Sequence, residues 1–181
     1  MSSEQLVRNC APTLAGIKTG SLYAIQGVDM DELKCDLSAL NRTLISKGVR
    51  IIPLKMSDDK VLIYIYRPQM LKKDLSDPNA QEILSELGYS LESVEVSVVE
   101  LILRLRSYGS FPHEIGLFLG YPPSDVRGFI HDPNNGYVMS GYWKVYSNED
   151  KARDLFRRYK TCTREYERML MAGRPLEQLV V

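Results

Sequence analysis

Apolar residues recur along much of the chain at the spacing of amphipathic helices. The clearest apolar stripe lies near the C-terminus, where such residues repeat every three or four positions between Ala152 and Met169. A second stripe starts at Met30, with acidic residues in its first turn and Gly48 as its stop. These patterns predict a long C-terminal helix and a shorter helix from residue 30.

Between the helical stretches lie segments with the β-branched and aromatic composition of strands. Residues 21–25 predict one strand, and residues 50–55 and 61–66 predict a β-hairpin. Pro53 cannot donate a hydrogen bond to a neighbouring strand, so its strand is predicted to lie at a sheet edge or to contain a bulge. The aromatic segment 141–146 predicts a further strand.

Helical pieces account for most of the remaining chain. Short helices are predicted near 69–74 and 78–87, and a longer one behind Ser90 as its N-cap. Residues 9–20 predict a short helix or tight loop, with Pro12 in its first turn. Together these elements predict an α+β fold in which a small, largely antiparallel sheet is backed by helices.

Composition narrows the class of protein. Of 181 residues, 44% are apolar and 25% charged, and 23 basic residues balance 23 acidic ones. These values argue against a disordered chain and remove the general attraction to nucleic acids and anionic membranes. No apolar run has the length of a membrane span or signal peptide, and three cysteines without a C-x-x-C pair fit a reducing compartment. We therefore predict a soluble cytoplasmic protein with one globular domain over residues 1–181, and two small subdomains as the alternative.

Residues 113–131 have the spacing of a helix-turn-helix hairpin. Gly116 lies where two helices must approach closely, and Gly120 lies where the turn needs a positive φ. The expected apolar contacts are Ile115, Leu119, Val126 and Ile130. A DNA-reading second helix needs several basic and polar side chains, yet this one carries a single arginine, Arg127. The hairpin is therefore predicted to be structural, with nucleic-acid binding as a disfavoured alternative.

Cys10 is the thiol whose surroundings most suggest chemistry. A helix that starts near Pro12 would lower its pKa and favour the thiolate. His113 as base, with Glu114 or Asp125 as orienting carboxylate, would complete the residue types of nucleophilic thiol catalysis. The opposing interpretation is that Cys10 is a small buried hydrophobe and His113 a helix-capping or core histidine.

Three further side chains are candidate ligand-binding residues. Arg67, Lys144 and Tyr146 end or line predicted strands, where they could present charge to a pocket at the sheet edge. Arg67 could equally hold the C-terminus of a helix. No two His or Cys residues have a metal-ligand spacing, so we predict no metal site, and the cofactor stays open.

Three sequence blocks carry a family resemblance. They read Cys-Ala-Pro-Thr-Leu-Ala-Gly from residue 10, Phe-Pro-His-Glu-Ile-Gly-Leu-Phe-Leu-Gly-Tyr-Pro from residue 111, and Gly-Tyr-Trp-Lys-Val-Tyr from residue 141. Over nearly its whole length the chain resembles an uncharacterised bacterial family, domain of unknown function 3793. The resemblance implies an anaerobic bacterial setting and a loose link to redox or iron metabolism, and it assigns no activity, cofactor or catalytic residue.

Three functions follow as hypotheses. We favour a cytoplasmic protein that binds a small ligand or a protein partner, with a pocket that gathers Cys10, Arg67, His113, Glu114 and Lys144. The second is a thiol hydrolase or transferase. The third is nucleic-acid binding through the 113–131 hairpin. The sequence leaves open the ligand, the oligomeric state and whether the protein is an enzyme.

Overall fold

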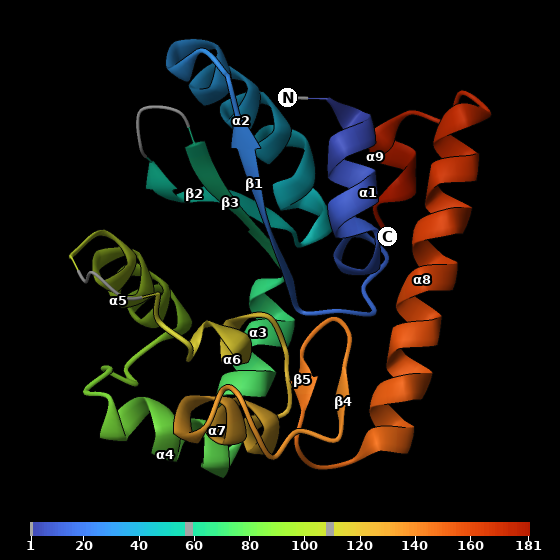
Figure 1. Cartoon of the computed structure of the whole chain (residues 1–181). Helices are drawn as coiled ribbons and strands as arrows, with labels where there is room; N and C mark the ends of the chain where they lie inside the picture. The colour runs from blue at the N-terminus through green and yellow to red at the C-terminus, as the bar shows by residue number, and fades with distance from the viewer. Residues whose placement is uncertain (1, 57–59, 108–110) are drawn as a thin grey trace. The chain divides into compact units, whose positions relative to one another are not determined.

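A computed structural model describes residues 2–56, 60–107 and 111–181 (Figure 1). The chain forms two compact units. Unit 1 comprises residues 1–69 and 159–181, and unit 2 comprises residues 70–158. The helix α8 (Glu149–Met171) contributes residues to both. The prediction of a single globular domain stays a prediction, whereas the predicted α+β class is confirmed.

Unit 1 is built on a three-stranded antiparallel sheet. Its strands are β1 (Gly20–Gln26), β2 (Arg50–Met56) and β3 (Lys60–Tyr66), in the order β1-β3-β2. The predicted hairpin is therefore confirmed. The strand that contains Pro53 is an edge strand, and its pairing with β3 shifts register between Pro53 and Lys55. Both expectations for this proline are met, because neither an edge position nor a bulge requires the backbone N–H that proline lacks.

Helices complete unit 1. They are α1 (Ser3–Leu14), α2 (Met30–Leu44), the 3-10 turn η1 (Ile45–Lys47), the second half of α8 and α9 (Leu176–Leu179). The α2 prediction is confirmed: Asp29 caps its first turn, and Gly48 ends the turn after it with a φ of 70°. The placement of Pro12 was wrong, since α1 starts nine residues earlier at Ser3 and Pro12 lies near its end.

Unit 2 is mainly helical. Its elements are α3 (Pro68–Leu75, whose first two residues belong to unit 1), α4 (Pro78–Glu86), α5 (Val94–Ser107), α6 (Ile115–Phe118), α7 (Pro123–His131), the two-residue strands β4 (Met139–Ser140) and β5 (Lys144–Val145), and the first half of α8. Ser90 is not an N-cap, because α5 begins at Val94 and the Ser93 hydroxyl accepts a hydrogen bond from the Val96 amide. The strand predicted over 141–146 is reduced to β5.

The predicted hairpin of helices is present as α6 and α7. A Cβ on Gly116 would lie 2.8 Å from Cγ2 of Val126, and Gly120 has a φ of 76°. Both glycines therefore have the roles that their spacing predicts. Ile115, Leu119 and Val126 are buried as expected, but Ile130 is exposed and is not one of the contacts. Among the described residues, no helix has both the length and the hydropathy needed to cross a membrane.

Candidate functional site

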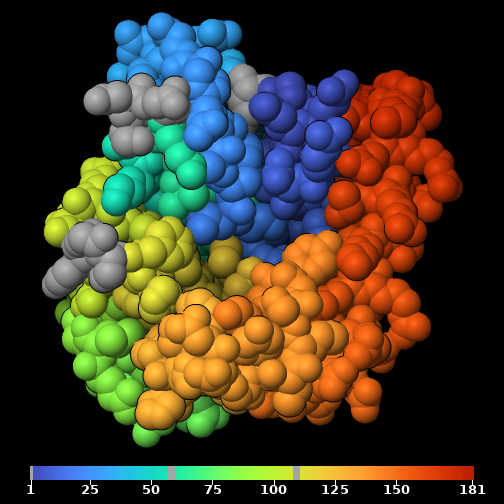
Figure 2. All heavy atoms as spheres, in the orientation of Figure 1, coloured from blue at the N-terminus to red at the C-terminus, as the bar shows by residue number. Residues whose placement is uncertain are grey.

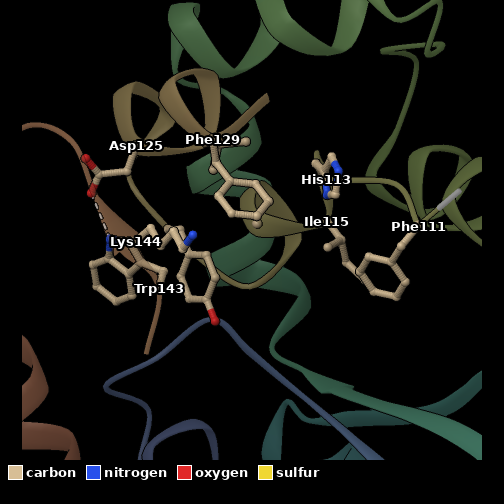
Figure 3. Close-up of a pocket in the computed structure, with 10 residues that line it drawn as sticks. Phe111, His113, Ile115, Asp125, Phe129, Trp143 and Lys144 are labelled. Carbon is tan, nitrogen blue, oxygen red and sulfur yellow. Dashed lines mark hydrogen bonds between the residues drawn. The ribbon is translucent and has the colours of Figure 1, made fainter. Parts of the chain in front are cut away.

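Unit 2 contains a pocket of about 300 Å³ between α6, α7 and the residues around β5 (Figure 3). Most of its lining side chains are aromatic or aliphatic: Phe111, Ile115, Tyr121, Val126, Phe129 and Trp143. Its polar lining residues are His113, Asp125 and Lys144. Asp125 and Trp143 lie at one end of the pocket, His113 and Phe111 at the other, and Phe129 between them. A mostly apolar cavity with a few polar groups is typical of small-molecule sites.

Asp125 fixes the geometry of one end of the pocket. It lies in the first turn of α7 and is 2% exposed. Its Oδ2 accepts a hydrogen bond from Nε1 of Trp143 at 2.8 Å. Its Oδ1 accepts hydrogen bonds from the backbone amides of Tyr146 and Ser147, each at 2.9 Å, and from the Ser147 hydroxyl at 2.8 Å. One carboxylate therefore joins α7 to β5 and the residues after it.

Trp143 is held by rings as well as by Asp125. Its ring stacks on Tyr121 with centroids 4.7 Å apart, and it meets Phe156 of α8 edge-on at 4.5 Å. The space-filling view shows the segment that leads into β4 and β5 as a continuous orange surface (Figure 2). Trp143 is the chain's single tryptophan, so it is a built-in reporter of this pocket.

Lys144 supplies the positive charge of the pocket. Its Nζ donates a hydrogen bond to the Pro133 carbonyl oxygen at 2.5 Å. The same nitrogen lies 4.6 Å from the ring centre of Tyr137 and 5.9 Å from that of Phe129. Aromatic faces attract a cation, so these contacts hold a half-buried ammonium that pairs with no carboxylate in the described part of the chain.

His113 and Glu114 precede α6 but differ in their surroundings. His113 is exposed and meets Phe129 edge-on, with ring centres 5.0 Å apart, so it is not a core histidine. Glu114 is buried and accepts a hydrogen bond from the Tyr89 hydroxyl at 2.9 Å. Burial, and after it the negative charge and hydrogen bond of Glu114, raise the pKa of Tyr89. His113 lines the pocket, whereas Glu114 is engaged with Tyr89.

The two other predicted ligand-binding residues make contacts within the protein. Arg67 of unit 1 donates hydrogen bonds to the carbonyl oxygens of Thr13 at 2.7 Å and Leu14 at 2.6 Å, which is the helix-terminus role given as its alternative. The Tyr146 ring packs against Gly128, and its hydroxyl donates to the Asp132 carbonyl oxygen at 2.7 Å. Of the predicted ligand-binding residues, the pocket lining therefore includes Lys144, while binding roles for Arg67 and Tyr146 stay predictions.

Cys10 belongs to unit 1, and His113 and Glu114 belong to unit 2. Cys10 is fully buried in the apolar core of unit 1, a cluster that also contains Leu6 and Leu14. Burial raises the pKa of its thiol, which disfavours the thiolate that a nucleophile needs. The helix-terminus argument for Cys10 was wrong, because the residue lies in the middle of α1 and not before its start. The catalytic hypothesis stays a prediction, and the burial of the thiol weighs against it.

In the described part of the chain, no group of three His, Cys, Asp or Glu side chains is placed to hold a metal ion. Arg127 of α7, the single arginine of the second hairpin helix, forms ion pairs with Glu82 at 2.7 Å and Glu86 at 3.1 Å. Its charge is thus balanced within unit 2.

The chain matches a protein-family model described as "Protein of unknown function (DUF3793)" over residues 6–180. The chain belongs to this family. No curated protein and no solved structure matches it. The family resemblance noted in the sequence is thereby confirmed, and the DUF3793 description assigns no activity.

In this DUF3793 chain, sequence reasoning named Lys144 and His113 but missed the aromatic wall of the pocket. Phe129 carried no signal beyond its place in a helical hairpin, and Tyr121 carried only its place in the family block that starts at residue 111. Trp143 stands inside one of the family blocks, and Asp125 was considered only as a catalytic orienter. No pattern in the sequence predicts that Asp125 is buried against Trp143, which lies 18 positions further along the chain.

Proposed function

We propose that this protein binds a small, flat, largely apolar molecule in the pocket of unit 2. The observation that carries the proposal is the lining itself, in which mostly aromatic and aliphatic side chains surround about 300 Å³, with the half-buried Lys144 and the exposed His113 among the few polar residues. Small-molecule sites commonly combine an apolar cavity with a few polar groups that orient the ligand.

The pocket is also held in shape before any ligand arrives. Asp125 ties α7 to β5, and the Gly116–Val126 contact sets the approach of α6 to α7. A preformed cavity lowers the cost of binding, because fewer side chains must be ordered when the ligand enters. This supports a binding role that depends on shape and apolar contact.

Fluorescence of Trp143 tests the proposal directly. A panel of small aromatic molecules is titrated while the tryptophan is excited selectively. A saturable change in emission is expected for those that fit, because the indole forms part of the wall. Phe129→Ala should weaken binding roughly tenfold, since about 1–2 kcal/mol of apolar contact is removed.

The matched control is Ile130→Ala, which alters the next residue of α7. Ile130 is exposed and does not line the pocket, so its variant should bind like the original protein. Thermal unfolding of both variants shows whether the fold is intact. Equal binding by the original protein and Phe129→Ala would overturn the proposed site. The cytoplasmic location stays a prediction, as does the link to redox or iron metabolism, which the ligand's identity would test.

A further inference from the structure

The two charged residues of the pocket, Asp125 and Lys144, differ in how many hydrogen bonds they already make within the protein. A carboxylate offers about four lone-pair positions. Asp125 already accepts four hydrogen bonds, one from the Trp143 indole, two from backbone amides and one from the Ser147 hydroxyl. Oδ1 accepts three of these bonds and Oδ2 one, and the residue is 2% exposed, so the carboxylate has little accessible capacity left for a ligand.

Lys144 is in the opposite position. An ammonium has three N–H donors and no acceptor. Within the described residues, one acceptor takes a hydrogen bond from it, the Pro133 carbonyl oxygen at 2.5 Å, and no carboxylate forms an ion pair with it. Its other contacts are the faces of Tyr137 and Phe129, which attract the charge but accept no conventional hydrogen bond. Two of its three donors therefore have no acceptor among the described residues.

We infer that the ligand of this pocket is a small monocarboxylate with a flat apolar body, whose carboxylate is bound by Lys144. The inference rests on the proposed function above and specifies its ligand class. The apolar body occupies the space beside Phe129 and Trp143, and the carboxylate accepts the two remaining Lys144 hydrogen bonds. A charge-assisted hydrogen bond in a largely apolar pocket is stronger than a neutral one.

Pocket size and charge argue against other ligand classes. Liquid water occupies about 30 Å³ per molecule, so about 300 Å³ holds a ligand of roughly ten non-hydrogen atoms. An amine would place a second cation beside Lys144 with no free carboxylate to receive it. A phosphate carries more charge and more acceptor oxygens than one half-buried ammonium can satisfy.

Three probes of nearly equal size distinguish these classes: phenylacetate, phenylacetamide and phenethylamine. Their dissociation constants are measured by calorimetry with the full chain near neutral pH. Phenylacetate is expected to bind at least tenfold more tightly than the neutral amide, and the amine most weakly. Raising the salt concentration should weaken the binding of phenylacetate and leave the binding of phenylacetamide unchanged.

Variants at Lys144 assign the discrimination to this side chain. Lys144→Met should remove the preference for phenylacetate over the amide, while Lys144→Arg should retain much of it because the charge remains. Lys151→Gln is the matched control, since Lys151 is an exposed lysine of α8 in the same unit and does not line the pocket. If Lys144→Met fails to fold, the salt dependence and the ranking of the three probes still decide.

Each outcome separates the inference from the proposed function. A saturable carboxylate affinity that Lys144→Met lowers to that of the amide supports the inference. Equal affinity for carboxylate and amide overturns it and leaves a neutral-ligand pocket in place. Binding by none of the probes overturns both the ligand class and the proposed pocket function for aromatic molecules of this size.

Discussion

The buried lysine of unit 1 makes the stability of that unit depend on pH. Lys18 is 5% exposed, and its Nζ donates a hydrogen bond to the Gly20 carbonyl oxygen. Burial lowers the pKa of Lys18 from 10.5 to about 7, because the charged form loses its hydration. The unfolded chain therefore binds more protons at Lys18 than the folded chain does between these two pH values.

The sign and size of the effect follow from this difference. Where the unfolded state binds more protons, the free energy of unfolding rises with pH. Each unit of pKa difference corresponds to about 1.4 kcal/mol. Because the pKa of Lys18 falls from 10.5 to about 7, this residue lowers the free energy of unfolding by about 5 kcal/mol below neutral pH. Between pH 7 and pH 9 stability should therefore rise by about 2 kcal/mol. Above about pH 9 the raised pKa values of Cys10 and Tyr23 oppose it, because the unfolded state then loses protons that the folded state keeps.

Urea unfolding followed by circular dichroism, at pH 7 and pH 9, measures this dependence. Lys18→Met removes the buried ionisable group. In this variant the free energy of unfolding should rise between pH 7 and pH 9 by about 2 kcal/mol less than it does in the original protein. Lys55→Met is the matched control, because Lys55 is an exposed lysine of the same unit. An unchanged pH dependence in Lys18→Met would refute the reasoning.

Other variants and a labelling experiment test separate contacts. Asp125→Ala leaves the Trp143 indole N–H without its acceptor, along with two backbone amides, and should lower the free energy of unfolding by about 3–5 kcal/mol, measured by urea titration. Gly116→Ala should cost about 1–3 kcal/mol through the contact with Val126, and adding Val126→Ala should recover part of this in the double variant. Mass spectrometry should show exposed Cys35 alkylated within the folded protein and buried Cys10 alkylated only with unfolding; equal rates at the two thiols would contradict their burial.

Local chemistry was sufficient to predict much of the fold. Pro53 predicted an edge or a bulge because its missing N–H limits it in any sheet. Gly120 predicted its turn because positive φ favours glycine wherever it occurs. The start of α5 was not predictable in this way, since Ser90 and Ser93 are both suitable caps. Packing between distant elements decides which residue begins a helix.

The site was harder to predict from the sequence than the fold, because it too depends on packing between distant elements. Lys144 could be named because it lies in a predicted strand, and His113 because histidines are rare in this chain. Asp125 acquires its role from the approach of residues 143–147 to α7, about twenty positions away. Periodicity within one element carries no information about such an approach. Cys10 shows the converse error, because a helix start placed nine residues too late changed a core residue into a candidate nucleophile.

The most direct test of the ligand pocket uses the single tryptophan. The protein is labelled with fluorotryptophan, and the one fluorine resonance expected from Trp143 is followed during titration with phenylacetate. We expect a saturable shift that Phe129→Ala weakens and Ile130→Ala preserves. A resonance that does not respond, or that responds identically in Phe129→Ala, would contradict ligand binding in this pocket.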